Sequence, residues 1–220
     1  QGVSSAASDV YKRQVLATVI GPGAGLWQLT AILIVIGGLI GYQLASKVEM
    51  TQMPELVAGM HALVGLAAVF VGFNAHFELA NVLTMDDTAK KTLEGFAALL
   101  AKKSGAEINI LRVEASLGIW IGAVTFTGSV IAYGKLSGKV TSAATKLPGG
   151  HLLNASAAIS SLACLGWYLS SGALLPLVIL TILALFIGVH LIMGIGGADM
   201  PVVVSMPVSY THLTLPTILL

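Results

Sequence analysis

The chain has 220 residues, of which 56% are hydrophobic and only 10% are charged, whereas about 25% of residues are charged in an ordinary soluble domain. This composition excludes a typical soluble globular protein and indicates a membrane protein. The formal net charge of +1 offers no basic surface for nucleic acid. A single cysteine, Cys164, excludes an internal disulfide bond.

The apolar segments predict an all-α fold, a polytopic bundle of transmembrane helices. A short apolar stretch, 15–21, follows the polar residues 1–14 and is typical of the last part of a span, so we expect a partial first span there. Five complete spans follow, each of about 20 residues, which is enough for a helix to cross a bilayer. They are Leu26–Ala45, Met53–Asn74, Ala115–Tyr133, Leu152–Ser171 and Ala173–Met193.

The longest polar segment, Ala75–Glu114, separates the second and third complete spans. Its middle part, Asp86–Lys103, spaces apolar residues as a helix does, which favours a short amphipathic surface helix. A solvated loop fits the same residues equally well. The segment is therefore expected to lie outside the bilayer in either case.

The loop Gly134–His151 sets the predicted orientation. It holds three lysines and no acidic residue, and cytoplasmic loops are enriched in Lys and Arg. Alternation of the spans then puts 46–55 and 194–206 inside as well, and 75–114 outside.

His61 is the ionisable side chain within the apolar part of the span Met53–Asn74. At about 100° per residue, one narrow helix face collects this histidine with small residues. These are Ala58, Gly65, Ala68 and Gly72. Small residues let neighbouring membrane helices approach closely, and an ionisable group in a membrane is costly without a partner or water. We therefore expect His61 on a packing face.

Two roles for His61 follow from its chemistry. The ordinary pKa of histidine, about 6.5, lets small changes of environment switch its charge near physiological pH, as a proton relay requires. Alternatively, the ring bonds a neighbouring backbone carbonyl and only fixes the packing of the helices. The residues alone leave both roles open.

Three other polar residues are weaker candidates. Ser129 lies on a second small-residue face, in Ala115–Tyr133, and this face can pack against the face of His61. Its hydroxyl could extend a chain of hydrogen bonds for protons. Serine in membrane helices, however, more often bonds its own helix. His190, near the cytoplasmic end of its span, is expected to snorkel to the interface. Asp199, in a glycine-rich interfacial segment, would either contact another domain or be solvated. No set of His, Cys and carboxylates has the spacing of metal ligands.

Three separated stretches resemble one known family: KVEMTQMPELVAGMHALVGLAAVFVGFN, GAVTFTGSVIAYGKLSGK and GIGGADMPVVVSM. In order and spacing they are similar to the membrane domain of the beta subunit of proton-translocating NAD(P) transhydrogenase, over roughly Val15 to Met206. The resemblance implies hydride exchange between NADH and NADP⁺ coupled to proton movement across a bacterial inner membrane. It also implies that His61 matches the proton-pathway histidine, Ser129 a serine of the associated helix, and Asp199 an aspartate in the loop facing the NADP(H)-binding domain.

The same resemblance predicts a partial chain. The family continues after Met206 with two further spans, which carry the asparagine expected to partner His61, and with the NADP(H)-binding domain. NADP(H) and NAD(H) are therefore expected to bind elsewhere in the parent enzyme, and this chain alone is expected to be inactive. The ends, 1–14 and 207–220, differ from the family and are interpreted as non-native tails, which leaves 15–206 as a partial transmembrane domain.

The expected partners are the lipid bilayer, the alpha subunit and the NADP(H)-binding domain, in a dimer of the complex, without nucleic acid. Two alternatives of other classes stay open: a fragment of a secondary transporter or channel, and a purely structural membrane subunit. A transporter predicts an internal repeat, but the helices of His61 and Ser129 share small-residue faces without an aligned motif.

Overall fold

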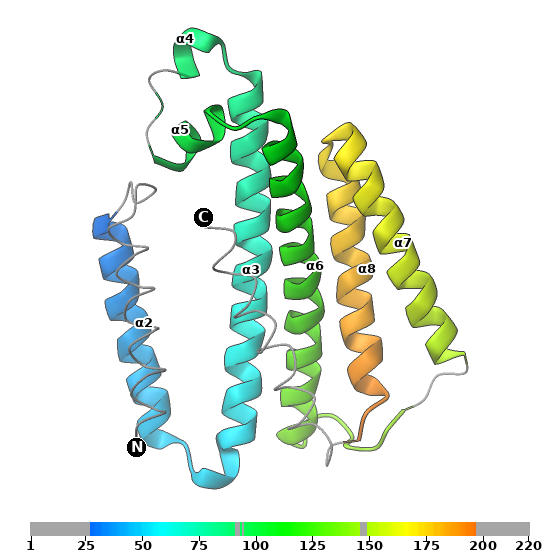
Figure 1. Cartoon of the computed structure of the whole chain (residues 1–220). Coiled ribbons are helices and arrows are strands. Elements are labelled where there is room, and N and C mark those ends of the chain that lie inside the picture. Colours follow the sequence, from blue (N-terminus) through cyan, green and yellow to red (C-terminus); the bar gives the residue numbers. More distant parts are fainter. Residues whose placement is uncertain (1–26, 91–92, 94, 146–148, 197–220) are drawn as a thin grey trace, which may run out of the picture. The chain divides into compact units, whose positions relative to one another are not determined.

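The computed structural model describes residues 27–90, 93, 95–145 and 149–196, and all elements within this part are helical (Figure 1). The elements are α2 (Trp27–Lys47), the 3-10 helix η1 (Met50–Gln52), α3 (Met53–Thr84), α4 (Asp87–Lys90), α5 (Gly95–Ala101), α6 (Gly105–Leu136), α7 (Gly150–Ser171) and α8 (Leu174–Met193). Five of them, α2, α3, α6, α7 and α8, are long and apolar enough to cross a membrane. The predicted all-α class and its five complete spans are confirmed. The partial span 15–21, both predicted tails and Asp199 lie outside the described residues.

Helices α3 and α6 are longer than predicted. Each has 32 residues, which corresponds to a length of about 48 Å, whereas the hydrocarbon core of a bilayer is about 30 Å thick. The polar segment expected over 75–114 is therefore helical at both ends, because α3 continues to Thr84 and α6 already begins at Gly105. Hydropathy marks only the part of a helix that lies in lipid; the backbone hydrogen bonds continue beyond it.

A capping box fixes the early start of α6. The Ser104 hydroxyl accepts from the backbone N–H of Glu107, and the Glu107 carboxylate accepts from the Ser104 backbone N–H at 2.7 Å. Ser-x-x-Glu before an apolar run is a sequence signal for a helix N-terminus. Before it, the expected amphipathic helix over Asp86–Lys103 is replaced by the two short helices α4 and α5.

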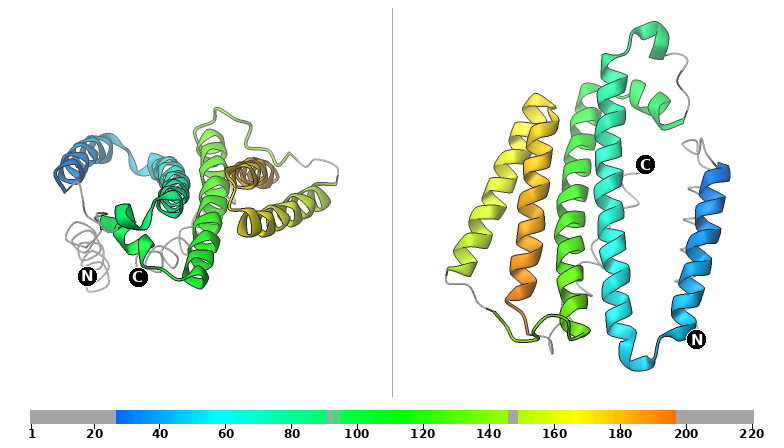
Figure 2. Two further views of the ribbon diagram at one scale, coloured as in Figure 1. Left: turned by 90° about the horizontal axis from the view of Figure 1, so that it is seen from above. Right: turned by 180° about the vertical axis from the view of Figure 1, so that it is seen from behind.

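The chain divides into two compact units. One contains α2, α4, α5 and the end of α3, and the other contains α3 up to Ala80 together with α6, α7 and α8. In the second unit, α8 lies between α6 and α7 (Figures 1 and 2). Its core collects side chains from all four helices: Val69 of α3, Ile119 and Ala123 of α6, Tyr168 of α7, and Leu177, Leu180 and Ala184 of α8.

The turn between α7 and α8 is as short as predicted. Gly172 ends α7 with φ of 63°, a left-handed conformation that glycine adopts without strain, and its N–H donates to the Tyr168 carbonyl at 2.8 Å. A Cβ at this position would also lie 2.7 Å from the guanidinium of Arg112. Pro176 lies in the first turn of α8, where a missing N–H costs no helical hydrogen bond.

Helices α6 and α8 pack closely along their length. The Thr127 hydroxyl of α6 donates to the Leu185 carbonyl of α8 at 2.9 Å. One turn further along α8, Gly188 lies directly against Thr127 and the Val124 carbonyl. The small residue and the interhelical hydrogen bond are both typical of membrane-helix packing. Helix α7 runs opposite to α6, and α8 runs opposite to α7. Helices α6 and α8 are therefore parallel and end on the same side of the unit (Figure 1).

Candidate functional site

One face of α3 is buried in the second unit. The buried positions follow steps of four and three residues, with two adjacent residues at 75 and 76: Ala58, Ala62, Gly65, Val69, Gly72, Ala75, His76 and Leu79. The face predicted from the sequence also contains Ala58, Gly65 and Gly72. Between them it has His61 and Ala68, where the observed buried face has Ala62 and Val69. His61 and Ala68 are half-buried at the edge of the face. His61 is therefore next to the helix contact and not at its centre.

The His61 ring bonds a backbone carbonyl of its own helix, which is the kind of contact that the packing role predicts. Its Nδ1 lies 2.7 Å from the carbonyl oxygen of Val57, one turn earlier. A carbonyl oxygen only accepts hydrogen bonds, so Nδ1 carries the hydrogen, and in the neutral ring Nε2 carries the lone pair. A proton can therefore be bound and released at Nε2 without breaking the bond that orients the ring.

Helices α3 and α6 touch through their backbones at Gly65 and Gly122, here called the glycine crossing. A Cβ on Gly65 would lie 2.7 Å from the Gly122 carbonyl oxygen, and a Cβ on Gly122 would lie 2.7 Å from the Gly65 carbonyl oxygen. Real Cβ atoms do not approach backbone atoms so closely, so the contact requires glycine on both helices. The two small-residue faces identified in the sequence do pack against each other.

The packing of α3 against α6 places Ser129 and His61 at the same level of this helix pair. One turn beyond them, away from the glycine crossing, Ala58 of α3 and Ala132 of α6 share a buried cluster. His61 follows Ala58 by three residues, and Ser129 precedes Ala132 by three residues, so both lie between that cluster and the glycine crossing. Ser129 is 6% exposed. The fold thus places two of the three predicted site residues at one level of two facing helices.

His76 is a buried histidine that the sequence reasoning placed outside the membrane part. It is 6% exposed, and its Nδ1 lies 2.9 Å from the hydroxyl of Tyr168 on α7, itself 1% exposed. Arg112 of α6 lies nearby and donates to the Leu169 carbonyl at 3.4 Å. The alternating spacing of apolar residues continues past Asn74, and this signal would have extended the helix to include His76.

His190 also differs from its prediction. It does not snorkel: its Nδ1 lies 2.8 Å from the side-chain oxygen of Asn154 on α7, and its ring stacks on Phe186. Its Nε2 is buried, points towards Gly150 and has no hydrogen-bond partner within the part of the chain that the structure describes. This pair joins α7 to α8, whereas His61 lies on α3.

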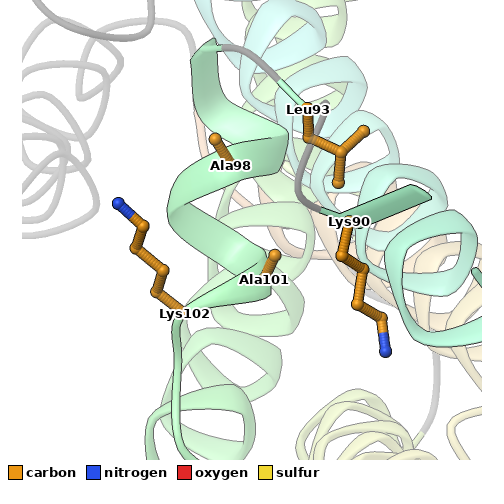
Figure 3. A pocket seen from close by; sticks show the side chains of 5 residues that line it. All are labelled: Lys90, Leu93, Ala98, Ala101 and Lys102. Carbon is orange, nitrogen blue, oxygen red and sulfur yellow. The ribbon is translucent and has the colours of Figure 1, made fainter. Parts of the chain in front are cut away.

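Neither a metal site nor a nucleotide site is evident in the described ranges. Among these residues no three His, Cys, Asp or Glu side chains gather as metal ligands would. An open pocket of about 380 Å³ in the first unit is lined by Lys90, Leu93, Ala98, Ala101 and Lys102 (Figure 3). Figure 3 shows the two lysine side chains pointing away from each other, so they do not converge on a shared anion.

Comparison with known proteins identifies the family. The sequence matches the family described as NAD(P) transhydrogenase beta subunit over residues 3–218. The chain belongs to the NAD(P) transhydrogenase beta subunit family. Two relatives named NAD(P) transhydrogenase subunit beta, both from Rhodospirillum rubrum, are each 39% identical to it over 197 residues, which is 90% of this chain and 39% of the relative.

The chain therefore spans about 39% of the length of the transhydrogenase subunits that it matches. Within that part, the five apolar helices make it the membrane region of such a subunit, a multi-pass membrane protein. The resemblance drawn from the three sequence stretches is confirmed.

Proposed function

We propose that this chain forms part of the proton pathway of a proton-translocating NAD(P) transhydrogenase. In this proposal, proton movement across a bacterial inner membrane is coupled to hydride transfer between NADH and NADP⁺. The parent complex contains an alpha subunit and an NADP(H)-binding domain, as a dimer, and Asp199 lies in the loop that faces this domain. His61 takes up and releases the transported proton, and Ser129 lines the same path.

The observation that carries the proposal is the place of His61, an ionisable side chain inside an apolar helix of a chain that belongs to the transhydrogenase beta subunit family. The ring is half-buried on a span, and its Nδ1 is held by the Val57 carbonyl at 2.7 Å. This bond orients the ring, and in the neutral ring Nε2 carries a lone pair that can accept a proton. A group with these properties, at the level of a buried serine, is what proton transfer through a helix bundle requires, because an ionisable group within a membrane is otherwise only a cost.

The residues described here do not fit a nicotinamide dinucleotide. Such cofactors bind where a glycine-rich turn joins a strand to a helix, and every element in the described ranges is helical. Hydride transfer is supplied by NAD(H) and NADP(H) bound elsewhere in the parent enzyme. The contribution of this chain is to bind, orient and pass on the proton.

Replacement of His61 in the full-length protein that contains this sequence, assembled with its alpha subunit in sealed vesicles, tests the proposal. His61→Ala should abolish proton-coupled hydride transfer and leave nucleotide binding intact. The matched control is His151→Ala, because His151 is exposed at the start of α7. Full coupled activity in His61→Ala would refute the assigned role.

A second measurement separates a proton carrier from a structural histidine. Nitrogen NMR of the His61 ring in bilayers, between pH 5 and 8, should show Nε2 gaining a proton while the Nδ1 hydrogen bond persists. A ring that stays in one state over this range supports a purely structural subunit. Vesicles that accumulate a solute, without any hydride transfer, would instead support the transporter alternative.

A further inference from the structure

Lys135 is a buried lysine in the last turn of α6 that the proposed pathway does not use. Its side chain is only 1% exposed. The Nζ donates to three backbone carbonyls at the end of α8: Ile192 at 3.1 Å, Met193 at 3.0 Å and Ile195 at 2.8 Å. We call Lys135 and these three residues the lysine cap.

The lysine cap gives hydrogen-bond partners both to the ammonium group and to the carbonyls at the end of α8. An ammonium group has three N–H donors, and all three have an acceptor here. The last carbonyls of a helix have no partner within the helix, and the C-terminal end of a helix carries a partial negative charge. Since α6 and α8 run in the same direction and end side by side, one positive charge between them offsets the charge of both ends.

The loop after α6 folds around the same point. The Thr145 N–H donates to the Met193 carbonyl at 3.0 Å, and the Ser142 hydroxyl donates to the Lys135 carbonyl at 3.3 Å. The loop and the segment after α8 are thus both tied to the last turn of α6. Without the ammonium, the Met193 carbonyl would keep the Thr145 N–H and the Ile192 carbonyl would keep the Ile195 N–H at 3.2 Å. The partly buried Ile195 carbonyl would lose its charged donor, which is costly.

The lysine cap is also continuous with the level of the candidate site. Ile192, whose carbonyl accepts from Lys135, packs with Ala58 of α3 and Ala132 of α6 in one buried cluster. Ala58 is one turn from His61, and Ala132 is one turn from Ser129. A displacement of α3 or α6 near His61 and Ser129 can therefore reach the end of α8 through the contacts of Ala58 and Ala132 with Ile192.

We propose that Lys135 is a positioning residue for proton coupling, which holds the segment leaving α8 in a fixed relation to α6. The inference rests on the proposed function. A shift of α6 or α3 that accompanies protonation is passed through the lysine cap to the residues that follow α8. Packed side chains and hydrogen-bond networks with two arrangements carry energetic coupling between distant sites, and the lysine cap is such a network.

The number of protons moved per hydride transferred tests this role, in the full-length protein assembled with its alpha subunit in sealed vesicles. Lys135→Met keeps the length of the side chain and removes its charge and donors. It should lower this ratio towards zero, because hydride transfer then proceeds without proton movement, with nucleotide affinity unchanged. Lys135→Arg, which keeps a cation and several donors, should restore most of the ratio. Lys139→Met is the control, since Lys139 is exposed one turn later.

A merely structural role would lower protein amount and all activities in parallel and leave the ratio unchanged, and that result would overturn the inference. If Lys135→Met does not accumulate, Lys135→Gln, which can reach fewer carbonyls, replaces it under the same criteria. If the unmodified protein moves no protons, the proposed function itself fails. If the unmodified protein moves protons and the Lys135 variants keep its ratio, only the role of Lys135 fails.

Hydrogen exchange of the chain in bilayers gives a readout independent of activity. Lys135→Met should speed amide exchange at the end of α8 and just after it, over 190–195, by at least about tenfold, because charged hydrogen bonds to carbonyls of this segment are lost. Exchange around Leu180 in the middle of α8 should not change. Equal protection of the last turn with and without the ammonium would show that the lysine cap holds nothing in place.

Discussion

The glycine crossing makes a quantitative prediction for Gly122→Ala. The new methyl carbon would lie 2.7 Å from the Gly65 carbonyl oxygen, 2.9 Å from the Ala68 Cβ and 3.1 Å from the Val69 nitrogen. Two of these three atoms belong to the backbone, so a change of side-chain rotamer cannot move them away. The two helices must separate instead.

The size of the separation sets the cost. Ordinary contact begins at 3.4 Å, so the Gly65 oxygen must retreat by about 0.7 Å. Extra methylene groups in a well-packed core typically cost about 1–3 kcal/mol, and a rigid backbone contact favours the middle or upper part of this range. A loss of about 2 kcal/mol lowers the ratio of folded to unfolded chain roughly 30-fold.

Gly118→Ala is the matched control. It lies one turn earlier on the same helix, and a Cβ there would meet nothing within 4 Å. Alanine is also the better helix former, by up to about 1 kcal/mol in water, so this variant should be as stable as the parent or more stable. The free energy of unfolding in micelles, followed by circular dichroism, compares the two. If Gly122→Ala is as stable as Gly118→Ala, the backbones of α3 and α6 do not meet at the glycine crossing.

The histidine pairs give two further predictions. Tyr168→Phe should lower the free energy of unfolding by about 1–3 kcal/mol, because it leaves the buried Nδ1 of His76 without its partner. The control Tyr133→Phe, at a side chain that is 37% exposed, should change this free energy little. Equal effects of both variants would contradict the buried hydrogen bond. Asn154→Leu should shift the Nδ1 resonance of His190 in nitrogen NMR and destabilise the contact of α7 with α8, and an unchanged resonance would show that the two side chains do not interact.

The sequence located the membrane spans and the start of α3 well, but missed the end of α3 and both ends of α6. About 20 apolar residues are a direct consequence of bilayer thickness, so α2, α7 and α8 were predicted to within two residues at either end. Helices α3 and α6 extend beyond the apolar part, and hydropathy carries no information about that extension. The Ser104 capping box, readable in the sequence, would have recovered one of the missed ends.

The small-residue faces were also visible in the sequence, because the spacing of glycine and alanine on a helix follows from helix geometry alone. Which positions of α3 meet the facing helix was not visible, and this decided the position of His61. The neighbouring helix meets α3 along steps through Ala62 and Val69, which leaves His61 at the edge of the contact.

The sequence by itself therefore determined that this is a helical membrane protein with small-residue faces and an ionisable residue within a span, since lipid imposes these patterns on each segment separately. Only the tertiary structure decided which polar groups are paired: His76 with Tyr168, His190 with Asn154, and Lys135 with the end of α8. In each pair the two residues are at least 36 positions apart in the chain. A buried polar side chain is stabilised by whatever the facing helix presents, and this depends on the packing of whole helices and not on local sequence.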